Sequence, residues 1–203
     1  MSSPIAANSR TAAFFDVDNT VVRTNVVRLF VEFCYRFKHI SRLRLAKFLL
    51  AALFSGVTRN KRFVRSAMMD MTSNVDFLAI EQDWERYVQY KEDLVIAQVE
   101  QIIEGHSQAG HILVMVSNNV DRLLAPLAKR LAFDHLICFK SELAADGAVS
   151  IPNASVLAYG LDKRAEVRGF AKERGIDLDR SFGYGDSQED TEFLGALGHS
   201  YMV

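Results

Sequence analysis

The sequence is poor in cysteine and proline, with two and three in 203 residues, and it has no apolar run long enough to cross a membrane. Cys34 and Cys138 form no CxxC pair, which excludes a disulfide scaffold and a cysteine-based zinc site. The longest apolar stretch, residues 45–57, is interrupted by Lys47 and Ser55 and falls short of the ~18 residues of a spanning helix. The first residues also lack the continuous apolar segment of a secretory signal. These absences predict a soluble, cytoplasmic protein.

An excess of charge of either sign is absent as well. The 24 lysines and arginines nearly cancel the 25 aspartates and glutamates, so the net charge of −1 gives no reason to expect a nucleic-acid partner. The composition, 49% hydrophobic and 24% charged, is typical of a globular protein and excludes extended disorder. The length suits one core with a small insert.

Short apolar runs alternate with helical segments in the second half of the chain. Strands are predicted at residues 11–17, 111–117, 135–139, 181–185 and 199–203, with helices at 120–131 and 162–174. This alternation predicts a parallel sheet in an α/β fold.

Between Asn25 and about Gly105 only helical periodicity is found. One helix is predicted to begin near Asp76 and to continue through Trp84 to Ile102, with its apolar side chains facing the core. We predict a three-layer α/β core formed by residues 1–22 and 106–203, with an inserted all-helical segment over residues 23–105.

Polar side chains follow three of the predicted strands and open one helix. They are Asp16, Asp18 and Thr20 after the first strand, Ser117, Asn118 and Asn119 after the second, Asp186 and Asp190 after the strand at 181–185, and Lys163 at the start of a helix. Because the carboxyl ends of parallel strands open onto one crevice, we expect these groups to meet.

Converging carboxylates need a cation, and oxygen ligands favour magnesium, which completes its shell with water and substrate phosphate oxygens. A lysine, a hydroxyl and helix N-terminal amides suit phosphoryl oxygens. The pattern therefore predicts a phosphorylated substrate.

These motifs, in this order and strand context, resemble those of the haloacid dehalogenase superfamily of phosphohydrolases. The resemblance covers almost all of the chain and is closest to the phosphoserine phosphatase-like branch, whose helical cap follows the first motif. It implies Mg²⁺ bound by Asp16, the backbone carbonyl of Asp18 and Asp186, with Asp190 in the surrounding shell. The implied fold is the Rossmann-like core with a helical cap.

The resemblance also implies the roles of the reacting groups. Asp16 is expected to attack phosphorus and form an aspartyl phosphate, and Asp18 to act as general acid and base. Thr20, Ser117, Asn118 and Lys163 are expected to bind the phosphate, with Ser117 and Lys163 also assisting catalysis.

The cap departs from the phosphoserine phosphatase pattern. The glutamate that binds the substrate ammonium in that branch is Asn25 here, which argues against phosphoserine and makes Asn25 a candidate substrate contact. Between Glu32 and Asp70 the chain has no acidic residue and nine lysines and arginines. We expect one of Arg59, Arg62 and Arg65 to reach the substrate.

The leading hypothesis is a magnesium-dependent phosphatase for the monoester of a small alcohol or amino alcohol. One alternative is a phosphatase for a lipid or isoprenoid phosphate bound by the basic, apolar cap, with an anionic membrane surface as a second partner. Another is an inactive anion- or partner-binding module. The sequence leaves the oligomeric state and the role of Glu189 open. His106 and His111 are expected on the surface, and both cysteines are expected to be buried and inert.

Overall fold

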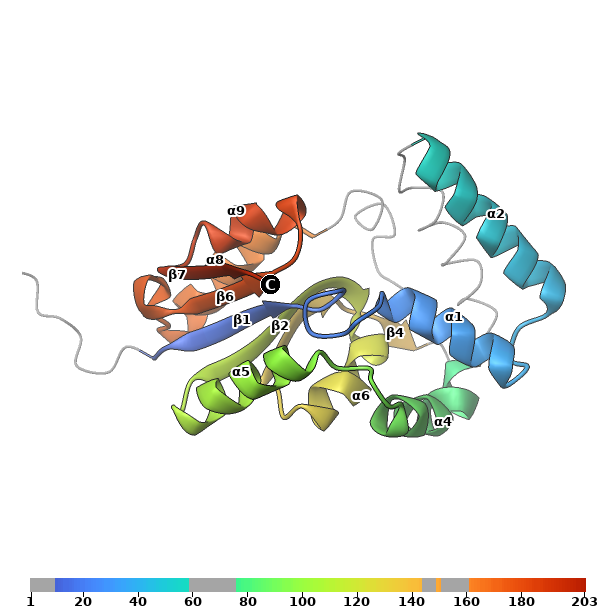
Figure 1. Cartoon of the computed structure of the whole chain (residues 1–203), viewed down its shortest axis with the longest axis horizontal. Helices are drawn as coiled ribbons and strands as arrows, with labels where there is room; N and C mark the ends of the chain where they lie inside the picture. The colour runs from blue at the N-terminus through green and yellow to red at the C-terminus, as the bar shows by residue number, and fades with distance from the viewer. Residues whose placement is uncertain (1–9, 59–75, 144–148, 151–160) are drawn as a thin grey trace, which may run out of the picture.

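A five-stranded parallel sheet forms the centre of the computed structural model, which describes residues 10–58, 76–143, 149–150 and 161–203 (Figure 1). The strand order is β3-β2-β1-β6-β7, and every pairing between neighbours is parallel. The strands are β1 (Ala12–Asp16), β2 (Ile112–Val120), β3 (His135–Phe139), β6 (Phe182–Gly185) and β7 (His199–Met202), and a separate antiparallel pair is formed by β4 (Glu142–Leu143) and β5 (Val149–Ser150). The predicted parallel sheet is confirmed, with β1 in the middle.

Helices cover both faces of this sheet. They are α1 (Val26–Arg36), α2 (Arg42–Thr58), α4 (Phe77–Tyr90), α5 (Ala97–Gln108), α6 (Asp121–Arg130), α8 (Lys163–Arg174) and α9 (Thr191–Leu194), with short 3₁₀ turns η1 (Leu178–Arg180) and η2 (Gln188–Asp190). Successive β1 side chains point to opposite faces. Ala12 and Phe14 pack with α8 and α9, whereas Ala13 and Phe15 belong to the core that includes α5 and α6. The result is the predicted three-layer α/β architecture.

The helices between β1 and β2 pack around a buried tryptophan. Trp84 of α4 is fully buried, and its ring meets that of Phe30 of α1 edge-on at 5.2 Å between centroids. Its indole Nε1–H donates to the Leu123 carbonyl at 3.3 Å, which ties α4 to α6 beside the sheet. The predicted packing role of Trp84 is confirmed.

The helix predicted from Asp76 to Ile102 is interrupted, so that part of the prediction is wrong. The chain leaves α4 after Tyr90, and Asp93 adopts a left-handed backbone conformation with φ of 52°. Val95 then pairs with Val22 in the loop after β1, and the Ile96 N–H donates to the Val21 carbonyl at 3.0 Å. Tertiary pairing thus ends the helix, and α5, which follows, packs on β2.

The apolar stretch at residues 45–57 lies within α2, which has 17 residues and continues past Gly56 to Thr58. Within the described ranges, none of the helices combines the length and the apolar character needed to cross a membrane. The sequence offers Thr58 as the N-cap of a further helix; Thr58 is the last residue of α2, and the residues that follow it lie outside the described ones.

Candidate active site

The turn after β1 places two aspartates at the carboxyl edge of the sheet. Asp16 ends this buried strand with 6% of its surface exposed. The chain then folds back, because the N–H groups of Val21 and Val22 both donate to the Val17 carbonyl at 3.0 and 3.1 Å. Within the turn, the Thr20 hydroxyl donates to Asp16 Oδ2 at 3.1 Å. Thr20 therefore orients the Asp16 carboxylate.

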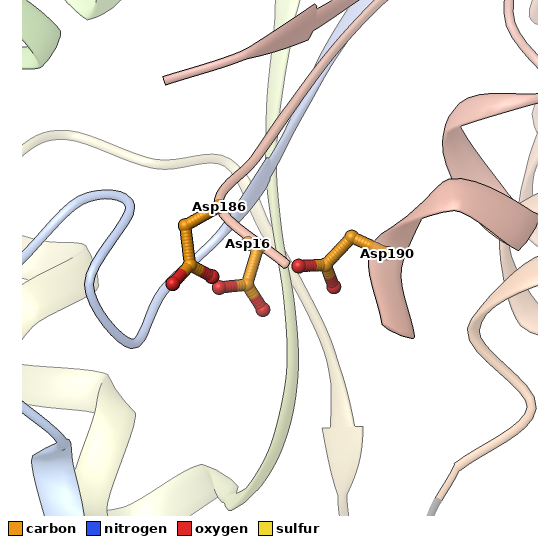
Figure 2. A group of neighbouring side chains, drawn as sticks. All are labelled: Asp16, Asp186 and Asp190. Carbon is orange, nitrogen blue, oxygen red and sulfur yellow. The ribbon is translucent and has the colours of Figure 1, made fainter. Parts of the chain in front are cut away.

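Three carboxylates meet at this edge, as Figure 2 shows. Asp16, Asp186 and Asp190 each offer an oxygen, and these oxygens lie within 4.8 Å of one another. Asp186 follows β6 directly, and Asp190 comes from η2. The close approach needs a glycine at position 185, since a Cβ there would lie 2.8 Å from the Asp190 Cβ. The sheet thus brings together groups that are about 170 positions apart in the sequence.

Lys163 lies against two of these carboxylates. Its Nζ donates to Asp16 Oδ1 at 2.5 Å and to Asp190 Oδ1 at 2.6 Å. The other Asp190 oxygen accepts from the N–H and the hydroxyl of Ser187 at 3.2 and 2.7 Å. Asp190 is therefore held by both of its oxygens, as expected of a group that supports its neighbours rather than one that turns toward a substrate.

The charges at this edge do not balance. Burial raises the pKa of Asp16 to about 6, although the Lys163 ammonium acts in the opposite direction. Burial and the nearby Asp190 also raise the pKa of Asp186. One ammonium among three carboxylates leaves an excess of negative charge, and all of the carboxylate donors are hard oxygens. This donor set fits Mg²⁺, which prefers one or two carboxylates and keeps other positions for water or phosphate oxygens.

Asp18 is held by donors from two other segments. Its Oδ1 accepts from the Val26 N–H at 2.8 Å, and its Oδ2 accepts from the side-chain amides of Asn25 at 2.6 Å and Asn119 at 3.1 Å. Burial raises the pKa of Asp18, while the hydrogen bonds from Val26 and Asn119 oppose that rise. The Asn25 side-chain oxygen caps α1 by accepting from the N–H groups of Val27 and Arg28. The start of the first inserted helix is therefore linked directly to the Asp18 carboxylate.

The polar residues at the end of β2 contact two different parts of the molecule. Ser117 and Asn119 face the first motif, and Asn118 contacts the segment before α8. The buried Ser117 hydroxyl accepts from the backbone N–H and the side-chain amide of Asn119 at 3.2 and 3.0 Å. Asn118 instead accepts from the Leu161 N–H at 2.7 Å, which anchors the approach to α8. Asn119 thus bridges Ser117 and Asp18. The motifs place Asn119 at the same polar strand end as Ser117 and Asn118, but they predict no role for it.

The remaining candidates fall into three sets. Arg59, Arg62 and Arg65 are outside the described residues. Glu189 is exposed, whereas the adjacent Asp190 is 1% exposed. Cys34 and Cys138 are buried free thiols, and burial raises the pKa of each to about 12, which agrees with the predicted inert role.

The surface prediction for His106 is wrong. This residue of α5 is 8% exposed, and its ring nitrogens form hydrogen bonds with His111 Nδ1 at 2.7 Å and the Tyr184 hydroxyl at 2.8 Å. Burial, with a contribution from His111, lowers the pKa of His106 to about 4. Helix α5 covers the sheet at this point, so His106 is buried between them. Its imidazole is neutral and hydrogen-bonded.

The sequence profile of the haloacid dehalogenase-like hydrolases matches residues 13–195 of this chain. The chain belongs to that family. The match spans β1 to the end of α9 and so includes every described residue of the carboxylate group. It confirms the family that the motifs predict.

Known proteins with similar sequences or folds agree with this assignment. A probable phosphatase of Mycobacterium tuberculosis is 26% identical over 203 residues, which cover 98% of this chain and 70% of that protein. A crystal structure of a protein of unknown function from Bordetella pertussis Tohama I matches 96% of this chain and 90% of its own, at a TM-score of 0.77 and 18% identity. A phospho-aspartyl intermediate analogue of phosphoserine phosphatase matches 96% and 87%, at a TM-score of 0.62 and 17% identity. The predicted enzyme class, a phosphoric monoester hydrolase, is confirmed, and the two structures support the fold.

Proposed function

We propose that this chain is a magnesium-dependent phosphatase that hydrolyses the phosphate monoester of a small alcohol or amino alcohol through an aspartyl-phosphate intermediate. The observation that carries the proposal is the meeting of Asp16, Asp186 and Asp190 beside Lys163. A buried, partly compensated group of carboxylates is costly to maintain for stability alone, and it matches the needs of phosphoryl transfer.

Asp16 is the nucleophile in this proposal. One of its carboxylate oxygens attacks phosphorus, the bond from phosphorus to the ester oxygen breaks, and the alkoxide leaves. Lys163 binds the phosphoryl oxygens as a fixed positive charge, and Ser117 offers its hydroxyl to them. Thr20 keeps the Asp16 carboxylate oriented.

Asp18 is the general acid and base. Its raised pKa favours the protonated form that the first step needs, in which Asp18 gives its proton to the leaving alkoxide. In the second step Asp18 accepts a proton from the water that attacks the acyl phosphate, and Asp16 is released. Asn119 and the Val26 N–H hold the Asp18 carboxylate for both steps.

Asp16 and Asp186, with the Asp18 backbone carbonyl, would hold Mg²⁺. Asp190 would lie in the shell that surrounds these ligands. The bound ion would supply positive charge against the negative charge that develops on the transferred phosphoryl group. The substrate assignment rests on the family and on the inserted helices. The link between Asn25 and Asp18 leaves the Asn25 amide engaged, so a contact of Asn25 with the substrate would require that link to open.

A panel of soluble phosphate monoesters, assayed with Mg²⁺ and again with chelator, tests the proposal. We expect phosphate release that depends on Mg²⁺ and is abolished by Asp16→Asn, whereas Asp83→Asn on the exposed side of α4 keeps full activity. A long-chain alcohol phosphate in the panel tests the lipid alternative, which the exposed leucines of α2 favour. Release that survives chelation would contradict the metal assignment, and an Asp16→Asn protein that still turns over would contradict the nucleophile.

A further inference from the structure

Helix α2 exposes a row of leucines to solvent. Leu43, Leu50 and Leu53 are 68%, 66% and 66% exposed, and Leu49 is 56% exposed. At 100° per residue these four positions fall within about one third of the helix circumference, so they lie on one side of the helix, and we call these four leucines the α2 ridge. The other side of α2 carries Phe48, which is 8% exposed and belongs to the main core. α2 therefore has two apolar faces, and among the described residues only the face with Phe48 joins the core.

The α2 ridge is unusual for a surface that is exposed only to solvent. Single exposed leucines are common, but contiguous apolar patches on globular proteins mark interaction sites. Figure 1 shows α2 standing away from the sheet, beyond the end of β1 that carries the catalytic aspartates. Helix α2 thus lies on the same side of the molecule as the proposed active site.

The charges around the ridge indicate the chemistry of that partner. The side chains of Arg36, Lys38, Arg42 and Lys47 are exposed, and no aspartate or glutamate occurs between Glu32 and Asp70. This local excess of positive charge arises in a chain whose net charge is −1. In a symmetric dimer through α2, the cations of one copy would meet the cations of the other without a carboxylate to pair with them. The charge pattern therefore argues against a second copy and for an anionic surface.

We propose that α2 is an interfacial helix that binds the chain reversibly to anionic lipid bilayers. The α2 ridge enters the boundary between head groups and acyl chains, and Arg42 at the start of the helix and Lys47 beside the ridge contact the lipid phosphates. The helix lies on the membrane and does not cross it, in agreement with its 17 residues. The inference does not depend on the phosphatase chemistry, because it concerns only where the molecule is held.

Co-sedimentation of the full chain with vesicles tests this proposal. One set of vesicles is phosphatidylcholine alone, and the other contains phosphatidylcholine and phosphatidylglycerol in equal amounts. We expect retention by the anionic vesicles, little retention by the neutral ones, and a decrease at high salt. The double variant Leu50→Glu/Leu53→Glu should lose about tenfold or more of its vesicle affinity, because two buried apolar contacts are replaced by charges that the lipid repels.

Two further variants make the test specific. Leu78→Glu changes a leucine of α4 that is 51% exposed, and it should bind vesicles like the unmodified chain. Arg42→Gln/Lys47→Gln leaves the ridge intact and should weaken anionic retention by roughly tenfold or more. Circular dichroism melting checks that each variant is folded.

Three results would overturn the proposal. The first is no retention of the unmodified chain by anionic vesicles, and the second is equal retention by both vesicle types. The third is a dimer in light scattering that Leu50→Glu/Leu53→Glu dissociates without any effect on vesicle binding, since a second copy would then cover the ridge. Vesicle retention is measured without substrate, so failure here is distinct from failure of the phosphatase proposal.

Discussion

Replacing Asp16 with asparagine should abolish phosphate release and, at the same time, stabilise the metal-free protein above neutral pH. The Asp16 side chain is 8% exposed, and burial raises its pKa from 3.8 to about 6 against the attraction of Lys163. A rise of about two units makes the ionised carboxylate about 3 kcal/mol less favourable in the folded chain than in the unfolded one. Asparagine removes this cost but also removes one of the two partners of Lys163. We therefore expect a net gain of about 1–2 kcal/mol, or a rise in Tm of roughly 3–6 °C.

The gain should depend on pH in a defined direction. Between the unfolded pKa of 3.8 and the folded pKa of about 6, the folded chain binds more protons at Asp16 than the unfolded chain does. The contribution of Asp16 to the free energy of unfolding is therefore fully present below pH 3.8, and it is lost as the pH rises from 3.8 to about 6. Asparagine does not titrate. The advantage of the variant should be absent near about pH 4 and complete above about pH 7.

Thermal unfolding followed by circular dichroism in chelator, at an acidic and an alkaline pH, measures both effects. Asp83→Asn serves as the control, because its carboxylate lies on α4 with 50% of the side chain exposed and should show no such pH-dependent gain. Adding Mg²⁺ should stabilise the unmodified chain more than the Asp16→Asn variant. An Asp16→Asn protein that is less stable than the unmodified chain at alkaline pH would refute the reasoning, since the carboxylates would then be compensated without a metal ion.

Three other substitutions test separate parts of the account. Lys163→Met should lower the free energy of unfolding in chelator by about 3 kcal/mol, because two buried carboxylates lose their shared cation, and urea denaturation measures this. Asn119→Ala should lower kcat about tenfold with little change in KM, because Asp18 loses a donor that orients it; unchanged steady-state kinetics would remove that role. For His106, burial lowers the folded pKa from 6.5 to about 4, so the stability of the unmodified chain should fall as the pH drops from 6.5 toward 4. His106→Gln should remove roughly 2 kcal/mol of that loss in pH-dependent denaturation, and an unaltered slope would contradict the neutral imidazole.

The sheet and the carboxylate group could be predicted because parallel strands impose a strong local pattern. The strand at 135–139 is β3 as the structure has it, and the helix predicted at 162–174 is α8 with its N-cap Asp162. Once those strands are parallel, their carboxyl ends must share one edge, which brings Asp16 near Asp186 without any knowledge of side-chain geometry. The family match and the 4.8 Å group agree with that argument.

Features that depend on contacts between distant segments could not be predicted. The interruption between α4 and α5 arises because Val95 pairs with Val22. The spacing of apolar residues along the sequence cannot predict a pairing between distant segments. In the same way, only the three-dimensional path of β2 decides that Asn119, and not Asn118, reaches Asp18. For the α2 ridge, the sequence shows which positions are apolar, but it does not show that these side chains are exposed to solvent.

The most direct test of the proposed mechanism is to look for the covalent intermediate itself. The chain is mixed with a phosphate monoester and Mg²⁺, quenched in acid within the first turnover, digested, and analysed by mass spectrometry. We expect the peptide containing Asp16 to carry one added phosphoryl group, hydroxylamine to remove it, and the Asp16→Asn variant not to acquire it. Turnover without any phosphorylated Asp16 peptide, or with the phosphoryl group on another residue, would contradict the central claim.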